Sequence, residues 1–228
     1  MKSGMAKIRI QFIIGQLTYG GSERHVADLA INLDKSRYEV QVICLRRGGQ
    51  LAGVLARAGV ETVFVFPFRG LTSAVKAFSP QVVYTCTYMD KLWGRLAAAL
   101  ARVPVIIAAQ RDEKRHWYEP WLSRLTTAYL CNSRRLQEMI RQKHRVAAEK
   151  IYYLPNGIDL GRYQETDLAQ ARKNLGLDLK SPLAVLVGRF QPVKDQATAL
   201  AALALVRREI PQARLLLVGQ GSCQVELE

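Results

Sequence analysis

A glycine-rich loop near the N-terminus is the first segment of this sequence that could do chemistry. Residues 15–22 read Gly-Gln-Leu-Thr-Tyr-Gly-Gly-Ser and separate an apolar run at 8–14 from a segment with helical periodicity. Gly20 and Gly21 would bring bare backbone amides to the start of a helix, where partial positive charge favours an anion. The loop therefore predicts an anion site, and a tight turn without a ligand is the alternative.

The same loop argues against two common nucleotide sites. Its G-x-x-x-x-G spacing is that of a phosphate loop, but Gly21 stands where a nucleoside triphosphatase needs lysine. It also lacks the G-x-G-x-x-G pattern, and the next apolar run ends in Leu45-Arg46-Arg47 rather than in the acid that holds a nicotinamide ribose. Triphosphate hydrolysis and a dinucleotide cofactor are therefore not indicated.

A second glycine turn, later in the chain, supplies two cations. Gly188 and Arg189 follow an apolar run at 183–187, and Lys194 stands near the start of the next helical segment. A guanidinium fork and an ammonium suit a diphosphate, because they can stabilise the negative charge that grows on a leaving phosphate. Alone, this stretch fits a plain surface turn equally well, but two such turns in one chain favour a ligand.

An alternation of apolar runs and helical segments must position these turns. Strands are expected at 8–14, 38–45, 60–66, 81–85, 104–108, 127–131 and 150–154, and helices from Ser22 onward and near 50–58, 70–78, 90–102 and 133–143. Crossovers of this length predict an α/β fold with a mainly parallel sheet.

The pattern breaks at Pro155 and starts again after a polar stretch. Strands at 183–187 and 215–218 with a helix from about 194 to 209 between them form a fresh α/β unit. Three elements cannot make a doubly wound sheet. We expect an N-terminal domain at 1–160, a linker at 161–180 and an incomplete second domain at 181–228.

Composition and charge bound the class of protein. Of 228 residues, 49% are apolar, which excludes a disordered chain. Lys and Arg number 33 against 19 Asp and Glu, and residues 1–150 hold 24 of the basic and 11 of the acidic side chains. This excess favours phosphates, nucleic acid or an anionic membrane surface. The scattered cysteines and the lack of an apolar run of ~18–20 residues predict a cytoplasmic protein that is peripheral to a membrane at most.

Five short motifs, in order along nearly the whole chain, resemble the family 4 glycosyltransferases. They are Gly20-Gly21-Ser22-Glu23-Arg24, Asn132-Ser133, residues 151–159 (Ile-Tyr-Tyr-Leu-Pro-Asn-Gly-Ile-Asp), Gly188-Arg189 with Lys194, and Leu217-Val218-Gly219-Gln220-Gly221. The resemblance implies a GT-B architecture of two facing Rossmann-like domains. It places the acceptor mainly on the first domain and the nucleotide-sugar mainly on the second, and it implies a reaction in the cleft that retains the anomeric configuration.

The resemblance also assigns the donor diphosphate to both glycine turns. Gly20 and Gly21 would contact it through backbone amides, while Arg189 and Lys194 would hold its phosphates from the other side. The sequence has no Asp-x-Asp for a divalent cation, so protein cations would neutralise the leaving group, and no metal or cofactor is expected. The catalytic residue stays unknown, because residues 83–88 lack the histidine of many members and the chain stops before the family's Glu-x7-Glu element.

Four further residues are candidates for the lining of the cleft: His25, Arg111, Asp112 and Asn156. His25 lies early in the first helix, where it could instead face solvent. Arg111 and Asp112 resemble an arginine-rich turn of some family members, and a surface ion pair between them is the alternative. The other histidines, His116 and His144, lie in charged stretches and are expected to be solvated.

Residues 111–145 could contact a membrane. They combine nine Lys or Arg with Trp117, Tyr118, Trp121, Leu122 and Leu125. This mixture is typical of an interfacial helix at an anionic leaflet, and a lipid-linked acceptor would fit such a location. The alternative is an amphipathic helix packed on the first domain with its charged face in water.

These observations together predict a retaining glycosyltransferase. It would move a sugar from a nucleotide-sugar to a glycan, lipid-linked or other acceptor, as in cell-surface polysaccharide or glycoconjugate synthesis. The alternative is a truncated, inactive remnant of such an enzyme. A nucleic-acid-binding module is less well supported, because the sequence shows no helix-turn-helix, zinc knuckle or RNP-like strand.

Overall fold

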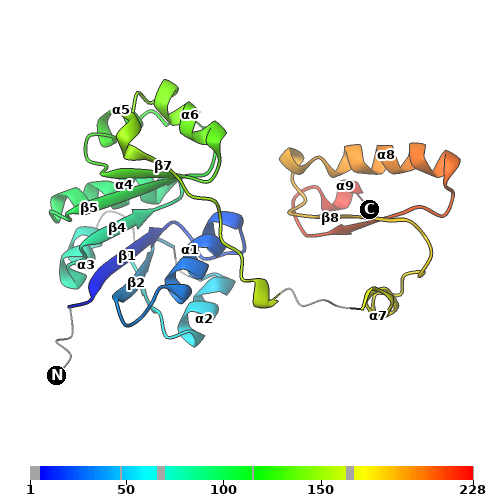
Figure 1. Ribbon diagram of the computed structural model, residues 1–228, viewed down its shortest axis with the longest axis horizontal. Coiled ribbons are helices and arrows are strands. Elements are labelled where there is room, and N and C mark those ends of the chain that lie inside the picture. The colour runs from blue at the N-terminus through cyan, green and yellow to red at the C-terminus, as the bar shows by residue number, and fades with distance from the viewer. Residues whose placement is uncertain (1–5, 47, 66–69, 115, 163–166, 228) are drawn as a thin grey trace. The chain divides into compact units, whose positions relative to one another are not determined.

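The structure is a computed structural model that describes residues 6–46, 48–65, 70–114, 116–162 and 167–227. Arg47, Phe66 at the end of the expected strand 60–66, and Arg115 lie outside this part. The chain divides into two compact units, residues 1–158 and 159–228 (Figure 1). Each unit is described by itself.

The first unit is built on one parallel sheet of seven strands. Its strands are β1 (Ile8–Ile14), β2 (Tyr38–Cys44), β3 (Glu61–Phe64), β4 (Val82–Thr85), β5 (Val105–Gln110), β6 (Ala128–Cys131) and β7 (Ile151–Tyr153). They lie in the order β3-β2-β1-β4-β5-β6-β7, and each pairs with its neighbours in parallel register. The expected parallel α/β fold is therefore confirmed.

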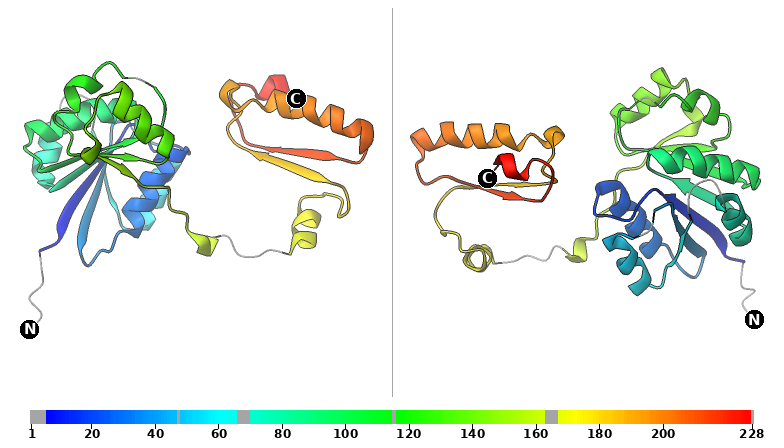
Figure 2. Two further views of the ribbon diagram at one scale, coloured as in Figure 1. Left: turned by 45° about the horizontal axis from the view of Figure 1, so that its top comes forward. Right: turned by 180° about the vertical axis from the view of Figure 1, so that it is seen from behind.

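Helices cover both faces of this sheet, as Figures 1 and 2 show. They are α1 (Gly21–Asn32), α2 (Gln50–Arg57), α3 (Leu71–Phe78), α4 (Tyr88–Leu100), α5 (Glu119–Leu122) and α6 (Arg134–Lys143), with a 3-10 turn at Ala148–Lys150. Successive side chains of a strand point to opposite faces. Phe12 and Ile14 accordingly pack with Val26 of α1 in one core cluster, whereas Ile13 packs with Val75 of α3 in another.

An interfacial helix was one of two alternatives for the aromatic stretch 117–125, which forms only the short helix α5. Strand β6 and helix α6 follow, close to the strand and the helix expected at 127–131 and 133–143. The stretch 117–125 alternates between buried and exposed side chains over short distances. Tyr118 and Leu122 are buried in the domain, whereas Trp117 and Trp121 are exposed.

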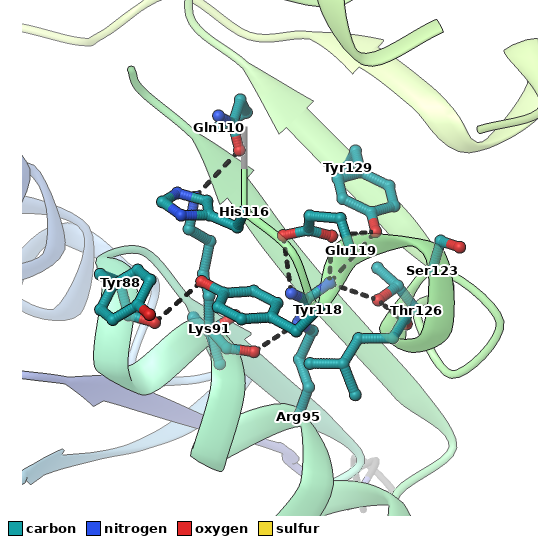
Figure 3. Close-up of polar contacts among 12 residues, drawn as sticks. Tyr88, Lys91, Arg95, Gln110, His116, Tyr118, Glu119, Ser123, Thr126 and Tyr129 are labelled. Carbon is teal, nitrogen blue, oxygen red and sulfur yellow. Dashed lines mark hydrogen bonds and ion pairs between the residues drawn. The ribbon is translucent and has the colours of Figure 1, made fainter. Parts of the chain in front are cut away.

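A buried ion pair fastens α5 to α4 (Figure 3). Arg95 of α4 and Glu119 of α5 are fully buried, and Arg95 Nη2 and Nη1 lie 2.7 and 2.9 Å from the two Glu119 carboxylate oxygens. Arg95 Nη1 also donates to the hydroxyls of Thr126 and Tyr129, both at 3.1 Å. Burial by itself would raise the pKa of Glu119, but the hydrogen bonds and charge of Arg95 outweigh it and hold that pKa below its ordinary value.

The second unit is smaller. Strands β8 (Leu183–Val187) and β9 (Arg214–Val218) pair in parallel, and its helices are α7 (Leu168–Asn174), α8 (Gln196–Glu209) and α9 (Gln224–Leu227), with 3-10 turns at Leu160–Arg162 and Pro192–Lys194. Helix α7 lies within the stretch expected to be a linker, and its start is capped by Asp167, whose carboxylate accepts from the Ala169 amide at 2.9 Å. Helix α8 begins at Gln196, two residues after the start that was expected at about Lys194, because Asp195 caps it.

Breaking the Arg95–Glu119 pair should destabilise the first unit strongly. Glu119→Gln keeps the shape of the side chain but removes the charge that faces Arg95. Because an unpaired charge is then left in the core, we expect the free energy of unfolding to fall by about 3–5 kcal/mol. Urea denaturation followed by circular dichroism measures the change.

Glu138→Gln is the matched control for this measurement. Glu138 pairs with Arg141 at 2.8 Å on the exposed face of α6, where ion pairs are screened by water. We expect its unfolding curve to superimpose on that of the unaltered chain. A Glu119→Gln curve that also superimposes would show that the buried pair does not hold α5 in place.

Candidate functional site

The glycine loop lies at the carboxyl edge of the parallel sheet, between β1 and α1. Gly20 is the N-cap of α1 in an extended conformation, and a Cβ atom there would collide with the Glu23 carboxylate. Glu23 is itself held by Gln16, whose Nε2 donates to Glu23 Oε1 at 3.2 Å. Gly21, in contrast, would place a Cβ atom in open space. The loop therefore presents one covered glycine and one accessible glycine.

An open pocket of about 360 Å³ lies beside this loop, at the point where β1 and β4 are neighbours. Helices connect in opposite directions from this pair of strands, and such switch points open a crevice at the carboxyl edge of a parallel sheet. The pocket combines hydroxyl, amide, carboxylate and guanidinium groups with apolar walls. It is lined by Gly15, Gln16, Glu23, Leu45, Arg46, Thr87, Tyr88 and Met89.

The start of α4 beside this pocket is fixed by a buried carboxylate. Asp90 Oδ2 accepts from the backbone amides of Cys86 at 2.5 Å and Thr87 at 2.8 Å, and the Thr87 hydroxyl donates to Asp90 Oδ1. Burial raises the pKa of Asp90 to about 6, although these hydrogen bonds oppose the rise. The loop between β4 and α4 is thus held rigidly next to the glycine loop.

His25 lies at the end of β4, although its own element is α1. It is buried, and its Nε2 atom is 3.1 Å from the Tyr84 hydroxyl. Burial is the main cause that lowers the pKa of His25 to about 4, and the nearby positive charge of Arg111 adds to it. The imidazole is therefore neutral at physiological pH. A histidine does reach the end of the fourth strand, but it comes from α1 rather than from residues 83–88.

Arg111 and Asn156 meet across the carboxyl edge of the sheet. Arg111 follows β5 and Asn156 follows β7, and Arg111 Nη1 donates to Asn156 Oδ1 at 2.9 Å. Asp112 turns to other partners: its main-chain oxygen accepts from Gln110 Nε2 at 2.6 Å, and its Oδ1 lies 3.7 Å from His116 Nε2. Three of the four candidate lining residues, His25, Arg111 and Asn156, are thus near one another, while Asp112 belongs to a neighbouring cluster.

The expectation that His116 and His144 are solvated is wrong. Both are buried, at 5% and 4% exposure. His116 stacks on Tyr118 with ring centroids 5.2 Å apart, and its pKa is lowered first by burial and next by the charge of Lys91. The neighbouring Lys114 and Lys143 are exposed, whereas the two imidazoles pack inward.

In the second unit, the cations of the glycine turn are accessible. Arg189 and Lys194 are exposed, and the turn between them is fixed by Gln196, whose Nε2 donates to the Arg189 carbonyl at 3.0 Å. The N-terminus of α8 is already capped by Asp195, which accepts from the Thr198 amide at 3.4 Å and hydroxyl at 2.8 Å. The side-chain cations are therefore the groups that this turn offers to an anion.

The last two glycine motifs form a single packed pair of turns. A Cβ atom at Gly219 would overlap the Gly188 carbonyl, and one at Gly221 would overlap the Phe190 carbonyl. The amide of Phe190 donates to the Gln220 carbonyl at 2.9 Å. Gly219 and Gly221 are thus explained by close packing of the backbone, which fixes the turn that carries Arg189.

A larger hollow in the second unit is lined by Arg207, Arg214 and mainly apolar side chains. It has a volume of about 540 Å³ and lies at the amino ends of β8 and β9, opposite the glycine turns. In the described residues, no group of three or more His, Cys, Asp or Glu is placed to hold a metal ion. All four cysteines are free thiols; Cys44, Cys86 and Cys131 are buried, and Cys223 is half-buried.

Several residues of the site were not singled out from the sequence. Tyr84 and Gln16 stand in ordinary strand and loop patterns, so nothing in the sequence marked them. Lys91 and Arg95 did carry a signal, because they are four residues apart in a helix that is mostly apolar and therefore share one face. Both are buried, and Lys91 Nζ donates to Gln110 Oε1 at 2.9 Å at the end of β5.

Comparison with known proteins gives a consistent result. The model of Glycosyltransferase Family 4 matches residues 19–162. The UDP-Gal:alpha-D-GlcNAc-diphosphoundecaprenol alpha-1,3-galactosyltransferase of Escherichia coli is 26% identical over 259 residues, which cover 100% of this chain and 66% of that protein. The D-inositol 3-phosphate glycosyltransferase of Segniliparus rotundus is 42% identical over 83 residues, which cover 36% of this chain and 18% of that protein.

The fold is also found among solved structures. A glycosyltransferase from Rickettsia africae ESF-5 superimposes with a TM-score of 0.78 at 13% identity, over 98% of this chain and 62% of that one. At this identity the likeness concerns the fold. The chain spans less than two thirds of the length of each of these three proteins.

The burial of His25 should make stability depend on pH. His25 has its ordinary pKa of 6.5 in the unfolded chain and a pKa of about 4 in the folded one. Between pH 4 and pH 6.5 the unfolded chain therefore binds more protons. Stability should therefore be lost as pH falls from about 6.5 to about 4. Relative to His25→Gln, we expect the unaltered chain to lose up to about 3 kcal/mol of unfolding free energy over this window. Urea denaturation at several pH values measures it.

Tyr84→Phe serves as the control, because burial and not the Tyr84 hydroxyl is the main cause of the lowered pKa. It should keep the pH dependence of the unaltered chain. Identical pH dependence in the unaltered chain and in His25→Gln would mean that His25 is not held neutral by the fold.

Proposed function

Because this chain belongs to Glycosyltransferase Family 4, we propose that it transfers a sugar from a nucleoside-diphosphate sugar to a glycan or lipid-linked acceptor, with retention of the anomeric configuration. The observation that carries the proposal is the exposed pair of cations, Arg189 and Lys194, on a turn that backbone packing fixes at the carboxyl end of β8. A departing diphosphate is the group whose growing charge such a pair stabilises.

The donor diphosphate is proposed to contact both glycine turns. Gly21 offers its backbone amide at the start of α1, with open space beside the residue, and Gly20 precedes Gly21 as the N-cap. Arg189 supplies a planar fork of donors and Lys194 a point charge. The amides would orient the diphosphate, while the cations would bear most of the charge that develops as the sugar leaves.

The acceptor is proposed to bind in the pocket at the β1–β4 junction. Gln16 and Glu23 offer an amide and a carboxylate to sugar hydroxyls, and Tyr88, 45% exposed, offers an aromatic face to the ring. The E. coli relative acts on a diphosphoundecaprenol-linked sugar according to its name, which supports a lipid-linked acceptor for this chain.

In this mechanism the bond between the anomeric carbon and the diphosphate oxygen breaks, and the acceptor oxygen bonds to that carbon on the same face. The acceptor proton passes to the departing phosphate. His25 is not proposed as the base, because it is buried and its Nε2 atom is already within hydrogen-bonding distance of the Tyr84 hydroxyl. His25, Tyr84 and Arg111 are proposed instead to hold the carboxyl edge of the sheet in shape.

Removal of either cation should weaken diphosphate binding. Arg189→Ala and Lys194→Ala each remove one charged contact, worth roughly 1.5–3 kcal/mol, so we expect affinity to fall by about 10-fold to 150-fold. Titration calorimetry with UDP and with GDP measures it. Arg208→Ala is the matched control, because Arg208 is an exposed cation near the other end of α8.

Unchanged affinity in both variants, or an equal loss in Arg208→Ala, would contradict the donor site. Turnover of nucleotide-sugars by the purified chain separates the enzyme from an inactive remnant. Binding without transfer to any acceptor would favour the remnant, whereas salt-sensitive binding to a random DNA duplex without diphosphate binding would favour the nucleic-acid module.

Gly21→Ala should separate binding from folding. A methyl group there meets no atom within 4 Å, and alanine favours a helix more than glycine does, so stability should not fall. If the diphosphate approaches the backbone at this point, the methyl group should lower affinity for UDP or GDP at least fivefold. Thermal unfolding and calorimetry on the same sample test both statements, and unchanged affinity would remove Gly21 from the site.

A further inference from the structure

Three large apolar side chains are exposed together around α5. Trp117 is 72% exposed, Trp121 is 71% exposed and Leu125 is 40% exposed. They stand four residues apart, with Trp117 before α5, Trp121 within it and Leu125 after it, and we name them the tryptophan surface. Tryptophan is highly buried on average in soluble proteins, so two indoles in solvent on one short segment require an explanation.

The frame beneath the tryptophan surface prevents these indoles from turning inward. Between them lie Tyr118 and Glu119, which are 2% and 0% exposed. The Tyr118 hydroxyl donates to the Tyr88 carbonyl at 3.0 Å, and Glu119 is paired with Arg95 (Figure 3). Because the inner face of the segment is already filled by these contacts, its outer face must present the tryptophans to whatever lies outside.

The charge around the tryptophan surface is positive. Lys114 and Arg124, three residues from Trp117 and Trp121 in the sequence, are exposed, and residues 111–145 contain nine basic and four acidic residues. Three of those four acids are engaged by arginines: Glu113 with Arg135, Glu119 with Arg95 and Glu138 with Arg141. The surface therefore combines exposed indoles with uncompensated cations.

We propose that the tryptophan surface docks this chain on an anionic lipid bilayer. Indole rings favour the boundary between headgroups and acyl chains, and nearby Lys and Arg are attracted by anionic headgroups. A protein partner fits less well, because two indoles of about 150–250 Å² each fall short of the roughly 800 Å² that a stable interface buries per partner. Docking would bring the first unit to a lipid-linked acceptor, but it does not depend on sugar transfer.

Vesicle flotation tests this docking without any nucleotide. We expect the full chain to float with vesicles of 70% phosphatidylcholine and 30% phosphatidylglycerol at low salt, and to float less at 0.5 M NaCl. The double variant Trp117→Ser with Trp121→Ser should show a partition coefficient at least tenfold lower. Leu100→Ser is the control: Leu100 is 69% exposed at the end of α4, so its variant also removes an exposed apolar side chain but should bind as the unaltered chain does.

Tryptophan fluorescence tests the position of the indoles. The chain has three tryptophans, so Trp93→Phe leaves Trp117 and Trp121 as the only emitters. With vesicles that contain brominated lipid, we expect their emission to shift to shorter wavelength and to be quenched at least twofold. Circular dichroism of each variant shows whether it is folded.

Three results would overturn the proposal. The first is no flotation of the unaltered chain at low salt. The second is flotation that the double tryptophan variant leaves unchanged, which would place the contact elsewhere. The third is concentration-dependent dimerisation abolished by the double variant in the absence of vesicle binding, which would make a second copy the occupant. None of these results bears on diphosphate binding, which Arg189 and Lys194 test separately.

Discussion

The parallel pairing of β1 with β4 is the constraint on which the arrangement of the first unit depends. All seven strands run in the same direction, so the loops that follow them meet at one edge. The glycine loop after β1 and the Asp90-capped start of α4 after β4 are therefore side by side, with the open pocket between them. Arg111 and Asn156 follow strands that end at this edge, whereas Asp112 turns to a neighbouring cluster.

A second requirement is that polar groups buried behind this edge have hydrogen-bond partners. Arg95 pairs with Glu119, and Lys91 donates to Gln110, while Arg111 donates to Asn156 at the edge itself. These contacts join α4, α5, β5 and the chain after β7, which are far apart in sequence. They do not perform the reaction in the proposed mechanism. They hold the loops in register, and they also leave the tryptophan surface facing outward.

The two units offer different chemistry at their glycine turns. In the first, Gly21 and the N-terminus of α1 provide main-chain donors, and the Glu23 carboxylate covers Gly20. In the second, Asp195 occupies the N-terminus of α8, so the exposed side chains of Arg189 and Lys194 carry the positive charge. Main-chain amides can orient a phosphate, whereas side-chain cations can neutralise its charge.

The sequence alone was enough to predict the parallel α/β fold, the position of nearly every strand and the family, because hydrophobic periodicity and glycine turns are local signals. It could not predict that His116 and His144 are buried, that His25 meets Tyr84, or that the aromatic stretch 117–125 forms only the short helix α5. Those outcomes depend on contacts between distant segments, such as Arg95 with Glu119, 24 residues apart. Burial and pKa are set by neighbours in space, and only the folded chain determines which neighbours those are.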